Sequence, residues 1–254
     1  MRGITLSGFK LHAIFCLAAI FTLPVLPVDA SVLGTVDIGR SGHGAGRTID
    51  VYGEGWSGAR GHAGVYMLEK TASSGAGDIW ANGAIGGFCI ELEEPAPNVT
   101  TTYDVENTSD AYNGYLGEVL GAAKADALSE LWGRYHSSAW EGAGGFTWAQ
   151  NNEAAAFATA VWEIVYEDLP ADVTDWDVGH DGKRGSPWFG SHQVDSTLAN
   201  SWLHSLDGSG PKASLAVFTQ AGNQNYLVAV PEPTTIALLG LGGIMSLARK
   251  RRRA

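Results

Sequence analysis

The sequence predicts an α+β fold in which a glycine-rich sheet, or a barrel-like sheet, carries a small inserted group of helices. Two observations support this prediction. Gly supplies 34 of the 254 residues and Trp supplies 9, whereas charged residues make up only 17% of the chain, a composition that suits a loop-rich domain containing strands. Predicted strands also lie on both sides of the predicted helices, which favours an α+β arrangement. We expect a signal peptide before this domain and an anchor helix after it.

Short runs of β-branched and aromatic residues between glycines predict the strands. Residues 48–52 and 64–68 are two such runs, and we expect hairpins with glycine turns there. Residues 86–92, with the sequence GGFCIEL, predict a strand that ends before two prolines. Residues 213–219 and 225–230 predict a hairpin that closes the fold.

Apolar side chains recur at helical spacing in three segments, residues 122–135, 153–167 and 194–206. Asn151 or Asn152 is the expected N-cap of the second helix. Gly208 is the expected stop signal after the third. In each segment the apolar side chains form a stripe along one face of the helix, which indicates packing against the core.

Charge is distributed unevenly along the chain. The two ends, residues 1–30 and 231–254, hold 7 of the 16 Lys and Arg and 2 of the 27 Asp and Glu, which leaves 9 basic and 25 acidic side chains and a net charge of −16 between them. A domain this acidic repels phosphate backbones, so we expect no nucleic-acid partner.

The first 30 residues have the three parts of a secretory signal peptide. Arg2 and Lys10 precede an apolar run over residues 12–26, and the sequence PVDA follows. Its small residues fit the cleavage rule, so we expect cleavage between Ala30 and Ser31. The alternative is a retained membrane anchor.

The last 24 residues combine a short motif, an apolar stretch and a basic cluster. The motif is Pro231, Glu232 and Pro233, and the cluster is Arg249, Lys250, Arg251, Arg252 and Arg253. The apolar stretch of about 15 residues spans roughly 22 Å as a helix, short of a ~30 Å hydrocarbon core. Basic residues stay on the cytoplasmic side, so we expect the C-terminus inside and the domain outside.

This order of features resembles the PEP-CTERM sorting signal. The resemblance implies that an exosortase, a membrane protease similar to transpeptidases, recognises and removes the tail. It also implies a Gram-negative bacterium, anchoring at the periplasmic side of the inner membrane, and later release to the cell surface or biofilm matrix. An ordinary tail anchor is the alternative.

A second resemblance covers roughly residues 50–230. It rests on three pieces in order, FCIEL at 88–92, AAAFATAVWEIVYE at 154–167 and QNYLV at 224–228. Together they resemble the thioester-domain proteins of bacterial surfaces. The resemblance implies that a cysteine, here Cys89, condenses with a glutamine side chain to form an internal thioester, which amines then attack.

This chain departs from that pattern at the glutamine. The family's glutamine lies two positions before an Ala-Ile-Trp-like triplet, and here that position is Ala158. Alanine has no carboxamide, so we expect Cys89 to remain a free thiol. The glutamines that could substitute are Gln150, Gln193, Gln220 and Gln224.

Other chemistry has weaker signals. Asp175, Asp177 and Asp181 alternate around a glycine as in calcium loops, but the downstream bidentate glutamate is missing. We therefore expect weak calcium binding or none, and no cofactor; a solvated acidic loop is the alternative. The histidines show no zinc spacing.

The sequence therefore predicts three parts: a signal peptide at 1–30, an exported thioester-domain-like domain at 31–230, and the sorting signal with a short transmembrane helix at 231–254. The expected role is non-enzymatic: structural, adhesive or binding. A covalent adhesin that uses Cys89 and a secreted glycan hydrolase remain open as alternatives. The expected partners are an exosortase, the membrane before processing, and exopolysaccharide or other surface proteins.

Overall fold

The computed structural model describes residues 32–53, 56–113, 117–179 and 189–231. Seven antiparallel strands form one sheet in the order β2-β3-β9-β8-β4-β1-β7. Their bounds are β1 Gly34–Gly53, β2 Trp56–Gly75, β3 Gly83–Cys89, β4 Thr101–Asn107, β7 Phe189–His192, β8 Leu215–Gln220 and β9 Asn223–Ala229. A separate two-stranded sheet pairs β5, Tyr112–Asn113, with β6, Glu118–Val119.

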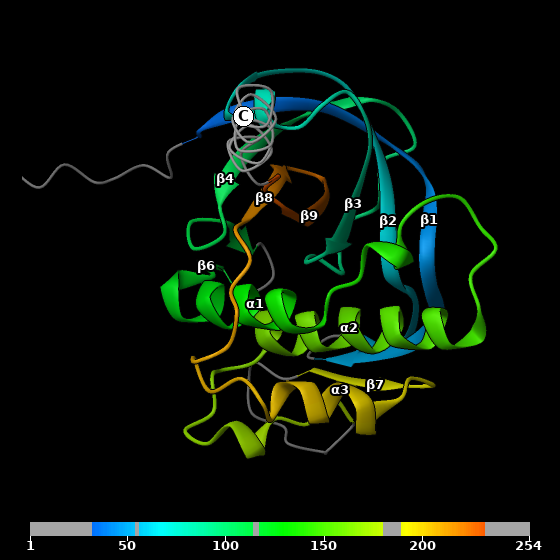
Figure 1. The fold of residues 1–254 in the computed structure, drawn as a ribbon, viewed down its shortest axis with the longest axis vertical. Helices are drawn as coiled ribbons and strands as arrows, with labels where there is room; N and C mark the ends of the chain where they lie inside the picture. Colours follow the sequence, from blue (N-terminus) through cyan, green and yellow to red (C-terminus); the bar gives the residue numbers. More distant parts are fainter. Residues whose placement is uncertain (1–31, 54–55, 114–116, 180–188, 232–254) are drawn as a thin grey trace, which may run out of the picture.

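The large sheet closes on itself because β1 pairs on both of its edges. Residues 34–38 of β1 pair with residues 101–105 of β4, and the same residues pair with the end of β2. Strands β1, β2, β3, β9, β8 and β4 therefore form a closed, barrel-like circuit (Figure 1). Strand β7 extends the sheet beyond this circuit through its pairing with residues 50–53 of β1.

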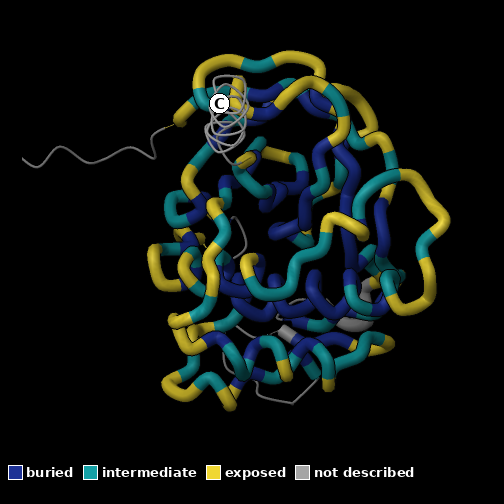
Figure 2. The backbone as a smooth tube through the Cα atoms, viewed as in Figure 1, coloured by how far each residue is buried: buried dark blue, intermediate teal, exposed yellow. Residues whose placement is uncertain are grey.

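Three α-helices are present in the described part of the chain: α1 Gly121–Tyr135, α2 Trp148–Tyr166 and α3 Ser196–Leu203. Helix α2 packs against β1 and β2, and α1, α3 and β7 contact α2 in turn (Figure 1). Residues 154–166 of α2 are all buried, whereas exposed residues lie mainly in the outer loops (Figure 2). The mixed architecture, with a large antiparallel sheet and three helices, confirms the sequence prediction at this level.

The extent of the first strands was predicted wrongly. Residues 48–52 and 64–68 are parts of two paired strands of 20 residues each, not separate hairpins. The glycines inside these strands do not end them, although β1 ends at Gly53 and β2 ends at Gly75. The β1–β2 ladder instead shifts register between Arg40 and Gly42 and between His43 and Gly46, and such bulges let a strand bend without stopping.

The predicted start of the second helix was also wrong. Helix α2 begins at Trp148, because Thr147 and Gln150 form a capping box: the Thr147 hydroxyl accepts from Gln150 N at 3.2 Å, and Gln150 Oε1 accepts from Thr147 N at 2.9 Å. Asn151 instead accepts a hydrogen bond from Gly46 N of β1 at 3.0 Å. Helix α3 likewise ends at Leu203, before the predicted Gly208 stop.

The two predicted terminal segments lie outside the described residues. Within the parts of the chain that are described, no helix is long and apolar enough to cross a membrane.

The register between β1 and β2 yields a stability prediction. Gly64 has a φ of 148°, and a Cβ there would lie 2.3 Å from the Ala45 carbonyl oxygen of β1. We expect Gly64→Ala to lower the free energy of unfolding by about 2 kcal/mol or more, because strained backbone and steric overlap combine. Gly61 is the matched control, since a Cβ there meets nothing within 4 Å. Equal denaturant midpoints for Gly64→Ala and Gly61→Ala would contradict the register.

Candidate functional site

The sorting motif follows the last strand directly. Strand β9 ends at Ala229, and Val230 N donates to Ser214 O at 2.9 Å. Pro231 is exposed. Glu232, Pro233, the basic cluster from Arg249 to Arg253, and the cleavage pair Ala30 and Ser31 lie outside the described residues. The tail therefore leaves the closed sheet from β9 without an intervening element.

Cys89 ends β3 in a buried position, with 2% of its surface exposed. Its Sγ donates to Glu91 O at 3.3 Å, and its carbonyl oxygen accepts from Trp162 Nε1 at 2.8 Å. Burial raises the pKa of the Cys89 thiol well above its usual range, and the hydrogen bonds to Glu91 and Trp162 oppose this only in part. A thiol held neutral in this way is a poor nucleophile.

Ala158 lies on the face of α2 that meets the end of β3. It is buried, and it precedes Trp162 by one helical turn, so the two residues share a face. The Phe88 and Phe157 rings pack with centroids 4.8 Å apart beside them. The Trp162 bond to the Cys89 carbonyl thus holds α2 against the end of β3, and residue 158 brings a methyl group and no acyl carbon to this contact.

Of the four candidate glutamines, the structure brings Gln224 to Cys89. Gln224 Nε2 donates to Glu91 O at 3.3 Å, the same oxygen that accepts from Cys89 Sγ. Its Oε1 is buried and has no hydrogen-bond partner among the described residues. The other three are engaged elsewhere: Gln150 caps α2, Gln193 donates to Asp50, and Gln220 accepts from Asn223.

We predict that Cys89 remains a free thiol in the mature protein. The thiol is buried and protonated, and the family's glutamine position holds Ala158. Intact mass should equal that of the unmodified chain, and alkylation should be slow in the native state and fast after denaturation.

A mass deficit of one ammonia would contradict this prediction. Gln224→Glu then identifies the partner, because the substitution keeps the side-chain shape and removes the amide nitrogen. Loss of the deficit in that variant, and its persistence in Gln150→Glu, would establish an internal thioester between Cys89 and Gln224.

Asp177, one of the candidate calcium ligands, is held by hydrogen bonds to other parts of the protein. Its Oδ1 accepts from Asn200 Nδ2 of α3 at 2.7 Å and from Gly179 N at 3.0 Å, and its own N–H donates to Glu163 Oε1 of α2 at 3.2 Å. Asp175 is exposed, and Asp181 lies outside the described residues. Within the described ranges, no three His, Cys, Asp or Glu side chains are grouped to hold one metal ion.

We therefore predict that Asp177→Ala destabilises the protein by about 1–3 kcal/mol, the cost of leaving the partly buried donors of Asn200 and Gly179 unpaired. The denaturation midpoint of the unmodified protein should be the same in calcium as in a calcium chelator. Asp175→Ala is the exposed control and should leave the midpoint unchanged. A calcium-dependent rise in midpoint that Asp177→Ala abolishes would restore the calcium hypothesis.

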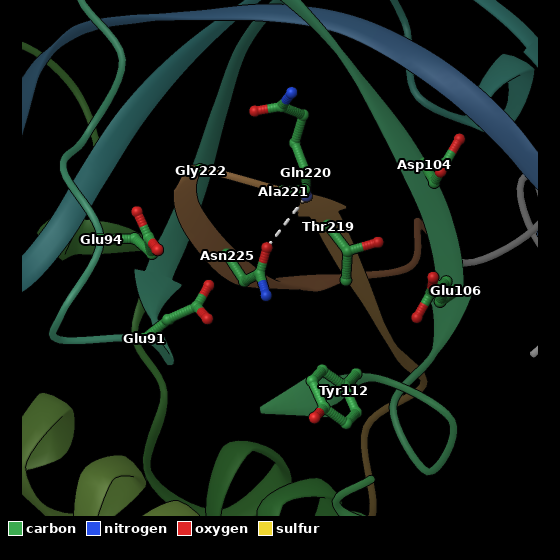
Figure 3. A pocket seen from close by; sticks show the side chains of 10 residues that line it. All are labelled: Glu91, Glu94, Asp104, Glu106, Tyr112, Thr219, Gln220, Ala221, Gly222 and Asn225. Atoms are coloured by element: carbon green, nitrogen blue, oxygen red, sulfur yellow. Dashed lines mark hydrogen bonds between the residues drawn. The ribbon is translucent and has the colours of Figure 1, made fainter. Parts of the chain in front are cut away.

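A pocket of about 400 Å³ lies where the segment after β3 faces β4 and the β8–β9 hairpin. Figure 3 shows carboxylates on its opposite walls, with Tyr112 at one end. Its lining is acidic, polar or small: Glu91, Glu94, Asp104, Glu106, Tyr112, Thr219, Gln220, Ala221, Gly222 and Asn225. We call it the acidic pocket.

The electrostatics of the acidic pocket are unbalanced. No Lys, Arg or His is among its described lining residues. Burial raises the pKa of Glu106, the carboxylates of Asp104 and Asp110 raise it further, and a hydrogen bond with Thr219 opposes the shift. The pocket therefore favours a positively charged occupant.

Asn225 places an amide in this pocket. It is 7% exposed, and its Oδ1 accepts from Gln220 N at 3.0 Å, which fixes the orientation of the amide group. Nδ2 therefore points the other way, between Glu91 and Tyr112 (Figure 3). This nitrogen has no hydrogen-bond partner in the described part of the chain.

Sequence reasoning missed the acidic pocket. The alternation of Asp104 and Glu106 places both on one face of β4, which is a readable signal. The opposite wall comes from Glu91 and Glu94, and the hairpin comes from more than 110 residues later in the chain. Strand pairing, which no local pattern specifies, brings these three segments together.

Residues 229–253 match the PEP-CTERM protein-sorting motif. Comparison with curated proteins and with solved structures gives no match. The thioester-domain resemblance therefore has no support beyond its own residues. The motif indicates a secreted protein that an exosortase processes, with export and membrane anchoring before that step.

Proposed function

We propose that residues 31–230 form an exported domain with a non-enzymatic structural, adhesive or binding role at the cell surface or in the extracellular matrix. The observation that carries the proposal is the sorting motif, which begins at the last residue of β9. Removal of the tail there would release the closed sheet intact. Exopolysaccharide and other surface proteins are the partners that fit this location.

The acidic pocket supports a binding role. Its volume lies within the range of small-molecule sites, and its polar groups converge from several elements. The β8–β9 hairpin that forms one wall also leads into the sorting motif.

Exosortase processing gives a direct prediction. In cells with the exosortase, the mature protein should begin at Ser31, lack the residues after the Pro-Glu-Pro motif, and occur in the surface or matrix fraction. In cells without it, the chain should keep its tail and stay in the membrane fraction. Mass spectrometry of both fractions measures this.

Glu232→Ala tests the motif itself, and Glu69→Ala on the exposed part of β2 is the matched control. Only the first should block processing. Identical partitioning of intact and tail-deleted chains in both kinds of cell would refute the proposal.

Hydrolysis of a glycan is the second candidate function, favoured by one observation. The acidic pocket places Glu106, whose pKa burial raises, opposite Glu91, and a pair of carboxylic side chains that flank the scissile bond is the catalytic arrangement of most glycosidases. Release of reducing ends from a matrix glycan, lost in Glu106→Gln, would establish it. Binding without product would favour the first proposal.

A further inference from the structure

We propose that the acidic pocket binds an amine-bearing sugar, a saccharide unit with a free ammonium group beside its hydroxyls. The inference rests on the proposed binding role and names the ligand class of that site. Three features of the pocket, taken in turn, lead to it.

Charge is the first feature. Asp104 and Glu106 project from one wall and Glu94 from the other, and none of the three has an ion pair with a described residue (Figure 3). Like charges confined in one cavity repel one another, and a bound cation relieves that repulsion. An ammonium group supplies three N–H donors, which suit carboxylate acceptors.

Asn225 is the second feature. Its Nδ2 is a donor, aimed into a cavity whose walls carry many acceptors. A bare metal ion offers no acceptor to this nitrogen, whereas a hydroxyl oxygen does. The Thr219 hydroxyl on the same side can either donate or accept. The occupant that satisfies the pocket therefore carries both a cationic donor and oxygen acceptors.

Tyr112 is the third feature. Its side chain is 55% exposed and lines the pocket. Its ring offers a flat apolar surface and attracts cations electrostatically. A sugar ring bearing an ammonium group can use both properties at once.

The volume of the cavity favours a saccharide over a single metal ion as the ligand. About 400 Å³ accommodates a small organic molecule, and the carboxylates come from separate walls. A saccharide unit fits a cavity of this volume, whereas a single ion leaves most of it empty.

The test uses the mature protein purified from cells and a tetramer of β-linked glucosamine, with the fully N-acetylated tetramer as the neutral counterpart. Calorimetry should show binding of the amine form at least ten times tighter than that of the acetylated form. The double variant Asp104→Asn with Glu106→Gln should lose at least tenfold in affinity. Glu69→Gln, which removes one exposed charge outside the pocket, should bind as the unmodified protein does.

Tyr112→Ala is a second variant, because its exposed ring contributes little to the core, and it should also weaken binding. Equal affinity for the two tetramers, unchanged affinity in both pocket variants, or binding of calcium chloride but not of the tetramer would overturn the inference. If any of these results is obtained and the double variant still occurs in the matrix fraction of the cells, the inference about the ligand fails while the proposed function stands. Absence of the unmodified protein, whose pocket is intact, from the surface and matrix fractions would instead refute the proposed function.

Discussion

The burial of α2 is the constraint on which the rest of the structure depends. Residues 154–166 are enclosed on every side, so the helix needs a partner on each face and a hydrogen bond for each polar group. These bonds join Asn152 to Arg47 of β1, Trp162 to the Cys89 carbonyl of β3, Tyr166 to Leu92 beyond β3, and Lys124 of α1 to the Val165 carbonyl. Each one fixes a different element against the same helix.

This central helix also explains the state of Cys89. The Trp162 bond holds the end of β3 against α2, and β9 lies beside β3 in the sheet, where Tyr226 pairs with Cys89. The thiol is therefore enclosed in the core, where burial favours its neutral form. The same β3–β9 pairing brings Gln224 beside it, which makes Gln224 the informative residue for any covalent chemistry at this position.

The acidic pocket is built differently, because no residue of α2 is among the lining residues that the structure describes. Its walls come from the segment that leaves β3, from β4 and from the hairpin that precedes the sorting motif. A pocket of this kind costs stability through the repulsion of its carboxylates, which the enclosed core can offset. The fold thus separates an enclosed apolar centre from a charged pocket.

The sequence by itself determined the features that are local. The sorting motif, the three helical segments and the final hairpin depend on residues within a few positions of each other, although the start of α2 was predicted at Asn151 or Asn152 and not at Thr147. Tertiary structure alone decided the closure of the sheet, the neighbourhood of Cys89 and Gln224, and the acidic pocket. The reason is that β3 pairs with β9 and β4 with β8, and strands so far apart in the chain pair through a register that no local pattern encodes.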